Sequence, residues 1–142
     1  MFTFSKKTII GRTEKVNIPQ LGLFNIPAKI DTGAYRGSIH ATDIKEVDES
    51  GVKILKFKLF DETHSEYKDK NYSFNNYKIH KFKAATVDSH NRFVIPVIME
   101  IAGKKIDIEL SLNDRKEMRN PILLGRRSLK KHFLIDVDLE NI

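Results

Sequence analysis

The sequence predicts a mostly β fold with very little helix. The strongest signal lies at residues 106–112, where Ile and Leu at the even positions alternate with Asp107, Glu109 and Ser111. Strict alternation of this kind gives a strand one buried side and one solvent-facing side. Helical periodicity is confined to a turn near 114–118 and a helix from Arg126 to about Lys131.

The remaining strands are predicted from short apolar runs. In chain order, runs bounded by Gly or Pro predict strands at 8–10, 16–18 and 26–30, and alternation of Leu and Phe with Lys predicts one at 55–59. Residues 93–101 place every second side chain on one apolar face. The tight turn Ala102-Gly103-Lys104 then joins this strand to 106–112 as a hairpin.

The polar stretch Asp61 to Asn76 has little alternation. We therefore expect a long exposed loop or a mobile hairpin, and long loops of this kind often cover a site. This segment is the sequence-based candidate for a flap.

Length and composition predict one globular domain spanning residues 1–142, without a secretory signal or a membrane span, and placed in the cytoplasm. With 25 Lys and Arg against 19 Asp and Glu, the net charge of +6 favours an acidic partner. The absence of cysteine excludes disulfides, thiolate zinc sites and cysteine nucleophiles.

Two segments place polar or glycine residues directly against an apolar strand. The strand that ends at Ile30 runs into Asp31-Thr32-Gly33-Ala34, which presents a carboxylate at a strand end; Gly33 is expected to permit the sharp turn and Ala34 a close backbone approach. The second segment is Ile122 to Arg126, an apolar run followed by Gly-Arg. An Asp-Thr-Gly tripeptide alone is a weak signal, since Asp commonly caps turns, but the two segments together are more specific.

Together these segments resemble the retropepsin-like aspartic proteases. The resemblance implies a closed β-barrel in which the Asp-Thr-Gly turn and the apolar-apolar-Gly strand interlock behind the active site, with one short C-terminal helix beginning near Arg126.

A closer resemblance, to the RimK-associated retropepsin-like family, covers nearly the whole chain. It rests on the motifs Gly11 to Glu14, Lys29 to Ala34, Ser38 to Ala41, Arg92, Leu112 to Arg115, Met118, Pro121 and Leu123 to Arg126. The resemblance implies an endopeptidase that trims glutamate tails, which a RimK-type glutamate ligase adds to a small-subunit ribosomal protein. That ligase is a possible partner.

Members of this family are often labelled ATP-dependent zinc proteases, but the motifs for ATP and zinc are missing here. The sequence has no Gly-x4-Gly-Lys-Ser/Thr loop and no His-Glu-x-x-His pair, and its five histidines are scattered. We therefore expect neither a cofactor nor a metal.

Aspartic proteolysis needs two carboxylates that share a proton. The chain has a single Asp-Thr-Gly, so the second Asp31 is expected from another copy in a twofold homodimer. The family resemblance implies that Thr32 orients the turn by hydrogen bonds across the dyad and that Gly33 lets the substrate backbone approach.

Basic side chains are the candidate contacts for an acidic substrate, because arginine binds carboxylates in bidentate fashion. Tyr35-Arg36 stands where retropepsins usually have an acidic partner for the arginine of the Gly-Arg segment. The candidates are Arg36, His40, Arg92, Arg115 and Arg126. Structural ion pairs of Arg115 and Arg126, and a purely structural His40, remain open alternatives.

Two other functions remain open. One is a non-catalytic dimeric module that binds acidic tails or a ribosomal surface. The other is a protease of broad specificity, in which the basic charge serves solubility alone.

Overall fold

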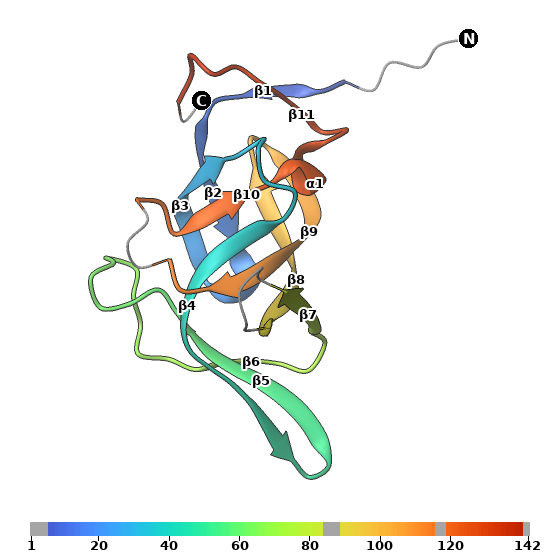
Figure 1. Cartoon of the computed structure of the whole chain (residues 1–142). Coiled ribbons are helices and arrows are strands. Elements are labelled where there is room, and N and C mark those ends of the chain that lie inside the picture. The colour runs from blue at the N-terminus through green and yellow to red at the C-terminus, as the bar shows by residue number, and fades with distance from the viewer. Residues whose placement is uncertain (1–5, 84–88, 116–118, 141–142) are drawn as a thin grey trace.

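A computed structural model describes residues 6–83, 89–115 and 119–140. Six strands close into a barrel in the order β10, β3, β2, β8, β9, β4, and β4 pairs with β10 to complete it (Figure 1). Their bounds are β2 Thr13–Ile18, β3 Leu23–Ile30, β4 Gly37–Glu49, β8 Ser89–Ile101, β9 Lys104–Asn113 and β10 Ile122–Leu124. The predicted mostly β, closed-barrel fold is confirmed.

The hairpin of β8 and β9 forms as its alternation predicts. Val97 pairs with Ile108 and Met99 with Ile106 in the antiparallel register. Ala102 and Gly103 form the turn with φ of 50° and 76°, which are the left-handed values that a two-residue hairpin turn requires. All four apolar side chains at the even positions of 106–112 are buried.

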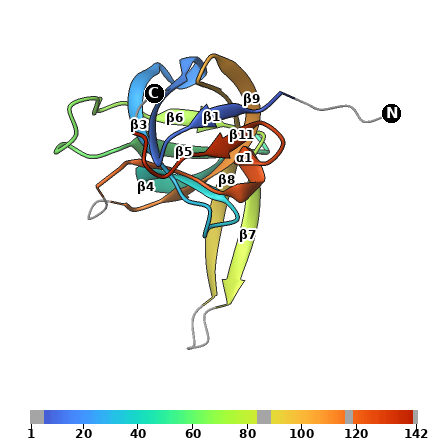
Figure 2. The ribbon, with the colours of Figure 1, turned by 90° about the horizontal axis from the view of Figure 1, so that it is seen from above.

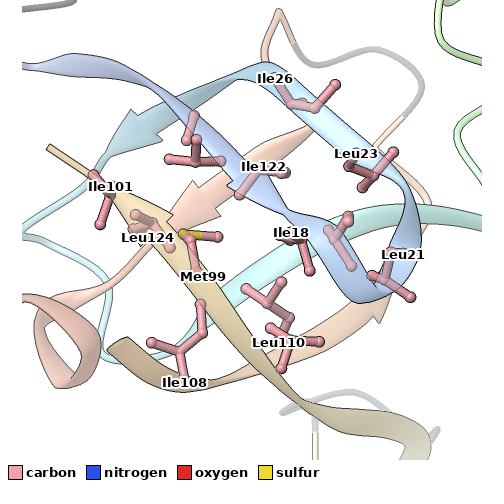
Figure 3. Close-up of a cluster of buried hydrophobic side chains, with 14 of the residues drawn as sticks. Ile18, Leu21, Leu23, Ile26, Met99, Ile101, Ile108, Leu110, Ile122 and Leu124 are labelled. Atoms are coloured by element: carbon pink, nitrogen blue, oxygen red, sulfur yellow. The ribbon is translucent and has the colours of Figure 1, made fainter. Parts of the chain in front are cut away.

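The barrel interior is filled by aliphatic side chains from every wall. Figure 3 shows Ile18, Met99, Leu110, Ile122 and Leu124 pointing toward one another, and each is almost fully buried. These residues come from β2, β8, β9 and β10, so the same core fixes the relative positions of strands that are distant in sequence. Burial of such side chains is the main favourable contribution to folding, at about 25 cal/mol per Å² of apolar surface.

A second group of strands extends from the barrel. β4 continues past it and pairs with β5 (Val52–Leu59), which pairs with β6 (Tyr72–Phe74). Phe57 stacks on Tyr72 and on Phe74, in both cases with 5.8 Å between ring centroids. The predicted strand at 55–59 therefore forms as part of a longer strand.

The segment 61–76, predicted as a long exposed loop or a mobile hairpin, is a mostly exposed connection from β5 to its antiparallel partner β6. Its first residue, Asp61, is an exception and is buried, with 8% of its surface exposed. In Figures 1 and 2 the green loop before β6 lies well away from the loop between β3 and β4. Its role as a flap stays a prediction.

Another hairpin, formed by β7 (Lys78–Lys83) and β8, projects from the barrel in Figure 2. The predicted helix at 126–131 is shorter than expected. It is α1, Arg126–Leu129, and the chain leaves it at Lys131, which has a φ of 74°. Residues 114 and 115 are not helical, and the rest of the predicted turn at 114–118 lies outside the described residues.

The two chain ends pair beside the barrel. β1 (Thr8–Ile10) and β11 (Phe133–Ile135) form a separate parallel two-stranded sheet, at the top of Figure 1. The predicted strand at 8–10 is β1, while those at 16–18 and 26–30 form within β2 and β3. Among the described residues, no helix is long and apolar enough to span a bilayer.

Candidate active site

The segment 31–36 crosses the end of β10, which lies between the two strands that this segment connects. β10 pairs in parallel with β3, Leu124 opposite Ile30, and antiparallel with β4, Ile122 opposite Ile39 (Figure 1). The backbone N–H of Asp31 donates to the Leu124 carbonyl at 2.9 Å. The interlocking of the two motifs implied by the sequence resemblance is therefore present.

The Asp31 carboxylate is oriented by its own turn. Its Oδ1 accepts the backbone N–H of Gly33 at 3.0 Å, and its carbonyl accepts that of Ala34 at 3.2 Å. Gly33 lies in the predicted turn and does not adopt a left-handed φ. A Cβ at this position would lie 3.2 Å from Asp31 Oδ1. Glycine is thus needed for room beside the carboxylate rather than for backbone freedom.

The backbone of this segment comes very close to Gly125. A Cβ at Gly125 would lie 2.6 Å from the Tyr35 carbonyl oxygen, a distance that real side chains do not tolerate. The next two backbone N–H groups, of Arg126 and Arg127, donate to the carbonyls of Ala34 and Tyr35 at 2.8 and 3.0 Å. Backbone hydrogen bonds from the start of α1 therefore fix the position of the segment 31–36.

Arg126 reaches back to the same segment with its side chain. Its Nη1 donates to the Thr32 carbonyl at 2.9 Å, and its guanidinium lies 5.8 Å from the centre of the Tyr35 ring. The guanidinium of Arg36 lies 5.7 Å from that ring. Two of the predicted substrate contacts thus lie near Tyr35, in the turn that contains Asp31. Arg36 also borders a surface cavity of about 430 Å³ together with Glu109 and Arg127.

Arg115 lies on the β9 side of Asp31. Its Nη1 donates to Ser38 Oγ at 3.2 Å and its Nε to the Asn120 carbonyl at 3.4 Å. Burial lowers the pKa of the Arg115 guanidinium, and the negative charge of Asp31 opposes that shift. Ser38, which accepts from the guanidinium, lies opposite Leu123 on β10. The next residue, Leu124, accepts the Asp31 N–H, so Arg115 is held on the strand that borders the Asp31 turn.

His40 is buried, and its ring contacts other parts of the same chain. Nε2 lies 2.6 Å from Asp61 Oδ2, and Nδ1 accepts the backbone N–H of Arg115 at 2.8 Å. With 5% of its side chain exposed and both nitrogens engaged, His40 supports the site rather than facing a substrate. This arrangement favours the structural alternative for His40.

Arg92, on β8, lies near the end of β9. When the Asn113 side-chain amide is oriented so that all its hydrogen bonds form, the Asn113 side-chain oxygen accepts from Arg92 Nη1 at 3.2 Å. Asn113 is also the strand neighbour of His40 in the pairing of β4 with β9. The structure thus groups Arg92, His40 and Arg115 at one end of β9, while Arg36 and Arg126 lie at Tyr35.

Sequence reasoning missed Asp61 as part of this site. It lies in a polar stretch without a motif, 21 residues from His40, and only the folded β4–β5 pairing brings the two together. Hydrogen bonds from the hydroxyl and N–H of Thr63, followed by the bond from His40, hold the pKa of the Asp61 carboxyl well below its usual range. Among the described residues, no group of three or more His, Asp or Glu side chains is arranged to hold a metal.

A profile of the RimB-like family, described as "Retropepsin-like aspartic endopeptidase RimB", matches residues 9–142. The chain belongs to this family. The match covers every described strand from β2 to β11, including both segments of the interlocked turn. The family membership expected from the sequence motifs is confirmed.

Several similar proteins are named as ligases rather than as endopeptidases. Proteins named "Probable alpha-L-glutamate ligase" from Desulfotalea psychrophila and Shewanella pealeana are 33% and 30% identical over 94% and 92% of this chain. The chain spans less than a third of their length, 29% and 28% respectively. These relatives therefore contain a segment similar to this RimB-like chain within a much longer protein.

A solved structure shares the fold over nearly the full length of both chains. It is a Legionella pneumophila protein of unknown function, 28% identical to this chain, with a TM-score of 0.72 and coverage of 96% of this chain and 98% of that one.

Proposed function

We propose that this chain is an aspartic endopeptidase in which Asp31 of two copies forms the catalytic dyad. The observation that carries the proposal is the orientation of Asp31 at the interlocked turn, in a member of a family of aspartic endopeptidases. One Asp-Thr-Gly per chain supplies half of a dyad. A second copy is therefore part of the proposal rather than an addition to it.

The chemistry follows from two carboxylates with one shared proton. The ionised Asp31 takes a proton from a water that attacks the peptide carbonyl, and the protonated partner carboxyl donates its proton to that carbonyl oxygen. In the tetrahedral intermediate, the now protonated Asp31 gives its proton to the peptide nitrogen while the partner carboxylate takes back a hydroxyl proton. The C–N bond then breaks and releases a carboxylic acid and an amine. Such a dyad titrates as a pair. The Gly33 amide keeps Asp31 Oδ1 in place by its hydrogen bond, while Thr32 is proposed to link the two turns. No metal or cofactor is needed for these steps.

The second copy is proposed to dock on the sheet formed by the chain ends. Ile9 and Leu134 are cross-strand neighbours on this sheet and expose 52% and 53% of their surfaces, and Val137 just beyond exposes 68%. A row of large exposed aliphatic side chains on a small sheet is typical of an interaction surface. Charge at Ile9 or Leu134 is then expected to shift the chain toward monomer.

The substrate is proposed to be a glutamate-rich protein tail. Arg36 and Arg126 lie at Tyr35 in the turn, Arg115 and Arg92 lie at the end of β9, and the net charge is +6. Relatives that include a similar segment are named as glutamate ligases. A hydrolase for the chains made by such a ligase fits both facts, with a ribosomal protein tail as target, the ligase as a possible partner and the cytoplasm as location.

The alternative is a dimeric module that binds acidic tails without cleaving them. Mass spectrometry of a peptide ending in several glutamates, incubated with wild type and with Asp31→Asn in the presence of EDTA, separates the two. The proposal predicts loss of glutamates with wild type only. Binding without cleavage by either protein would support the module, and equal cleavage by both would remove Asp31 from the catalytic role.

A further inference from the structure

The buried pair formed by His40 and Asp61 connects three separate segments of the chain. His40 lies on β4, Asp61 follows the end of β5, and Arg115 follows the end of β9. The imidazole contacts the other two at once, through Nε2 to Asp61 at 2.6 Å and through Nδ1 to the backbone N–H of Arg115 at 2.8 Å. Asp61 is itself anchored by the backbone N–H of Thr63 at 2.8 Å and by the Thr63 hydroxyl.

These hydrogen bonds define which ring nitrogen carries the proton. A backbone N–H can only donate, so His40 Nδ1 must present its lone pair to Arg115. The ring proton then lies on Nε2 and is donated to the Asp61 carboxylate. Asp61 thereby selects the tautomer of His40 that can hold Arg115.

Arg115 is the cation at the end of this chain of contacts. Its side chain is hydrogen-bonded to Ser38 on β4, and its charge is coupled to that of Asp31. His40 and Ser38 are two residues apart on the same strand. β4 therefore accepts hydrogen bonds from both the backbone N–H and the guanidinium of Arg115.

We propose that His40 and Asp61 are positioning residues, which hold Arg115 beside Asp31 so that its guanidinium binds a glutamate side chain of the substrate. This inference rests on the proposed acidic substrate but does not depend on cleavage. It assigns the pair a role in substrate affinity, with His40 and Asp61 themselves making no contact with the substrate.

Two substitutions of His40 separate the two halves of its contact. In His40→Asn the amide oxygen takes the place of Nδ1, so the acceptor for Arg115 is kept. In His40→Gln the amide nitrogen takes the place of Nε2, so only the contact with Asp61 is kept. Each variant loses one buried hydrogen bond, which makes them a matched pair for stability.

The test measures binding of a glutamate-ended peptide to these variants in an Asp31→Asn background, where the peptide is not consumed. We expect His40→Gln to weaken binding about tenfold, because the displaced Arg115 guanidinium then loses its charge-assisted hydrogen bond to a carboxylate of the peptide. His40→Asn should bind nearly as well as its parent. Arg115→Gln should bind as weakly as His40→Gln, and the double variant no more weakly than either alone.

Two results would overturn the inference. One is equal binding by His40→Gln and His40→Asn, each in proportion to its stability in denaturant, because this is the pattern of a purely structural pair. The other is unchanged binding by Arg115→Gln. If the wild type binds the peptide with the expected pattern but never cleaves it, the peptidase proposal fails while the positioning role is supported.

Discussion

The guanidinium of Arg126 donates a 2.9 Å hydrogen bond to the carbonyl of Thr32, a residue 94 positions earlier in the chain and next to Asp31. Three contacts from the Gly125 to Arg127 segment therefore converge on the Asp31 turn, since the backbone N–H groups of Arg126 and Arg127 also donate to it. The segment 125–127 therefore stabilises this turn in addition to the turn's own hydrogen bonds.

Arg126→Ala is expected to leave the fold intact and to lower activity, because the backbone contacts remain while the side-chain bond to Thr32 is lost. The free energy of unfolding should fall by about 1 kcal/mol, the usual contribution of one such hydrogen bond. Activity on a glutamate-ended peptide and denaturant unfolding check both effects. Arg127→Ala is the matched control, because the Arg127 side chain pairs with Glu109 at 3.3 Å instead, and an equal loss of activity in it would contradict the assignment.

Two glycines of the site are expected to differ in what they control. In Gly125→Ala the new Cβ meets rigid backbone at Tyr35, so we expect a loss of about 2 kcal/mol in stability, as for other overpacked positions. In Gly33→Ala the Cβ meets only the Asp31 carboxylate. This variant should stay close to wild type in stability and lose most of its activity. Thermal unfolding and peptide cleavage distinguish them, and the reverse pattern would refute this account of the turn.

The Asp61 carboxyl makes stability depend on acid pH. Its pKa is lowered in the folded state, first by the hydrogen bonds from Thr63 and then by His40. Its stabilising contribution is therefore complete above the unfolded value of 3.8 and is lost as the pH falls below that value. Asp61→Asn should be less stable than wild type at neutral pH and lose less on acidification. Denaturant unfolding from neutral pH to pH 3 measures this, and parallel pH curves for the two proteins would contradict it.

The Tyr77 hydroxyl makes stability depend on alkaline pH. Its hydroxyl donates to Glu46 Oε2 at 2.5 Å, and this bond, together with burial and the Glu46 charge, raises the pKa of Tyr77 to about 12. The folded chain then keeps a proton that the unfolded chain loses near pH 10, so this contribution to stability falls as the pH rises from about 10 to about 12. Tyr72, whose pKa is raised by burial, should titrate late in both proteins, whereas ultraviolet titration should show Tyr77 as a late tyrosine in wild type but not in Glu46→Gln. An unchanged titration in that variant would remove Glu46 as the cause.

Local patterns in the sequence were sufficient for the parts of the fold that depend on neighbouring residues. The β8–β9 hairpin follows from alternation and from a turn that tolerates left-handed φ, and the Asp31 turn follows from its motif. The closure of the barrel depends on β10 pairing with both β3 and β4, which no local pattern specifies. For the same reason Asp61 could not be linked to His40, because only the folded β4–β5 pairing brings their segments together.

The turn predicted at Gly33 forms. The room that Gly33 leaves beside the Asp31 carboxylate depends on how the turn folds back on itself, and no sequence pattern specifies it. Arg115 could be named as a candidate from its motif. The support it receives from His40 and Ser38 could not, because these contacts cross between strands.

The most direct test of the central claim is subunit mixing, because it asks whether each site needs Asp31 from two copies. Wild type and Asp31→Asn are co-refolded in equal amounts, mixed dimers are verified by native mass spectrometry, and cleavage of a glutamate-ended peptide is measured. If each site needs both carboxylates, random pairing leaves about half of the wild-type chains in active dimers, so activity falls to about half that of the same wild-type chains alone. Unchanged activity in the presence of mixed dimers would contradict a dyad shared between two copies.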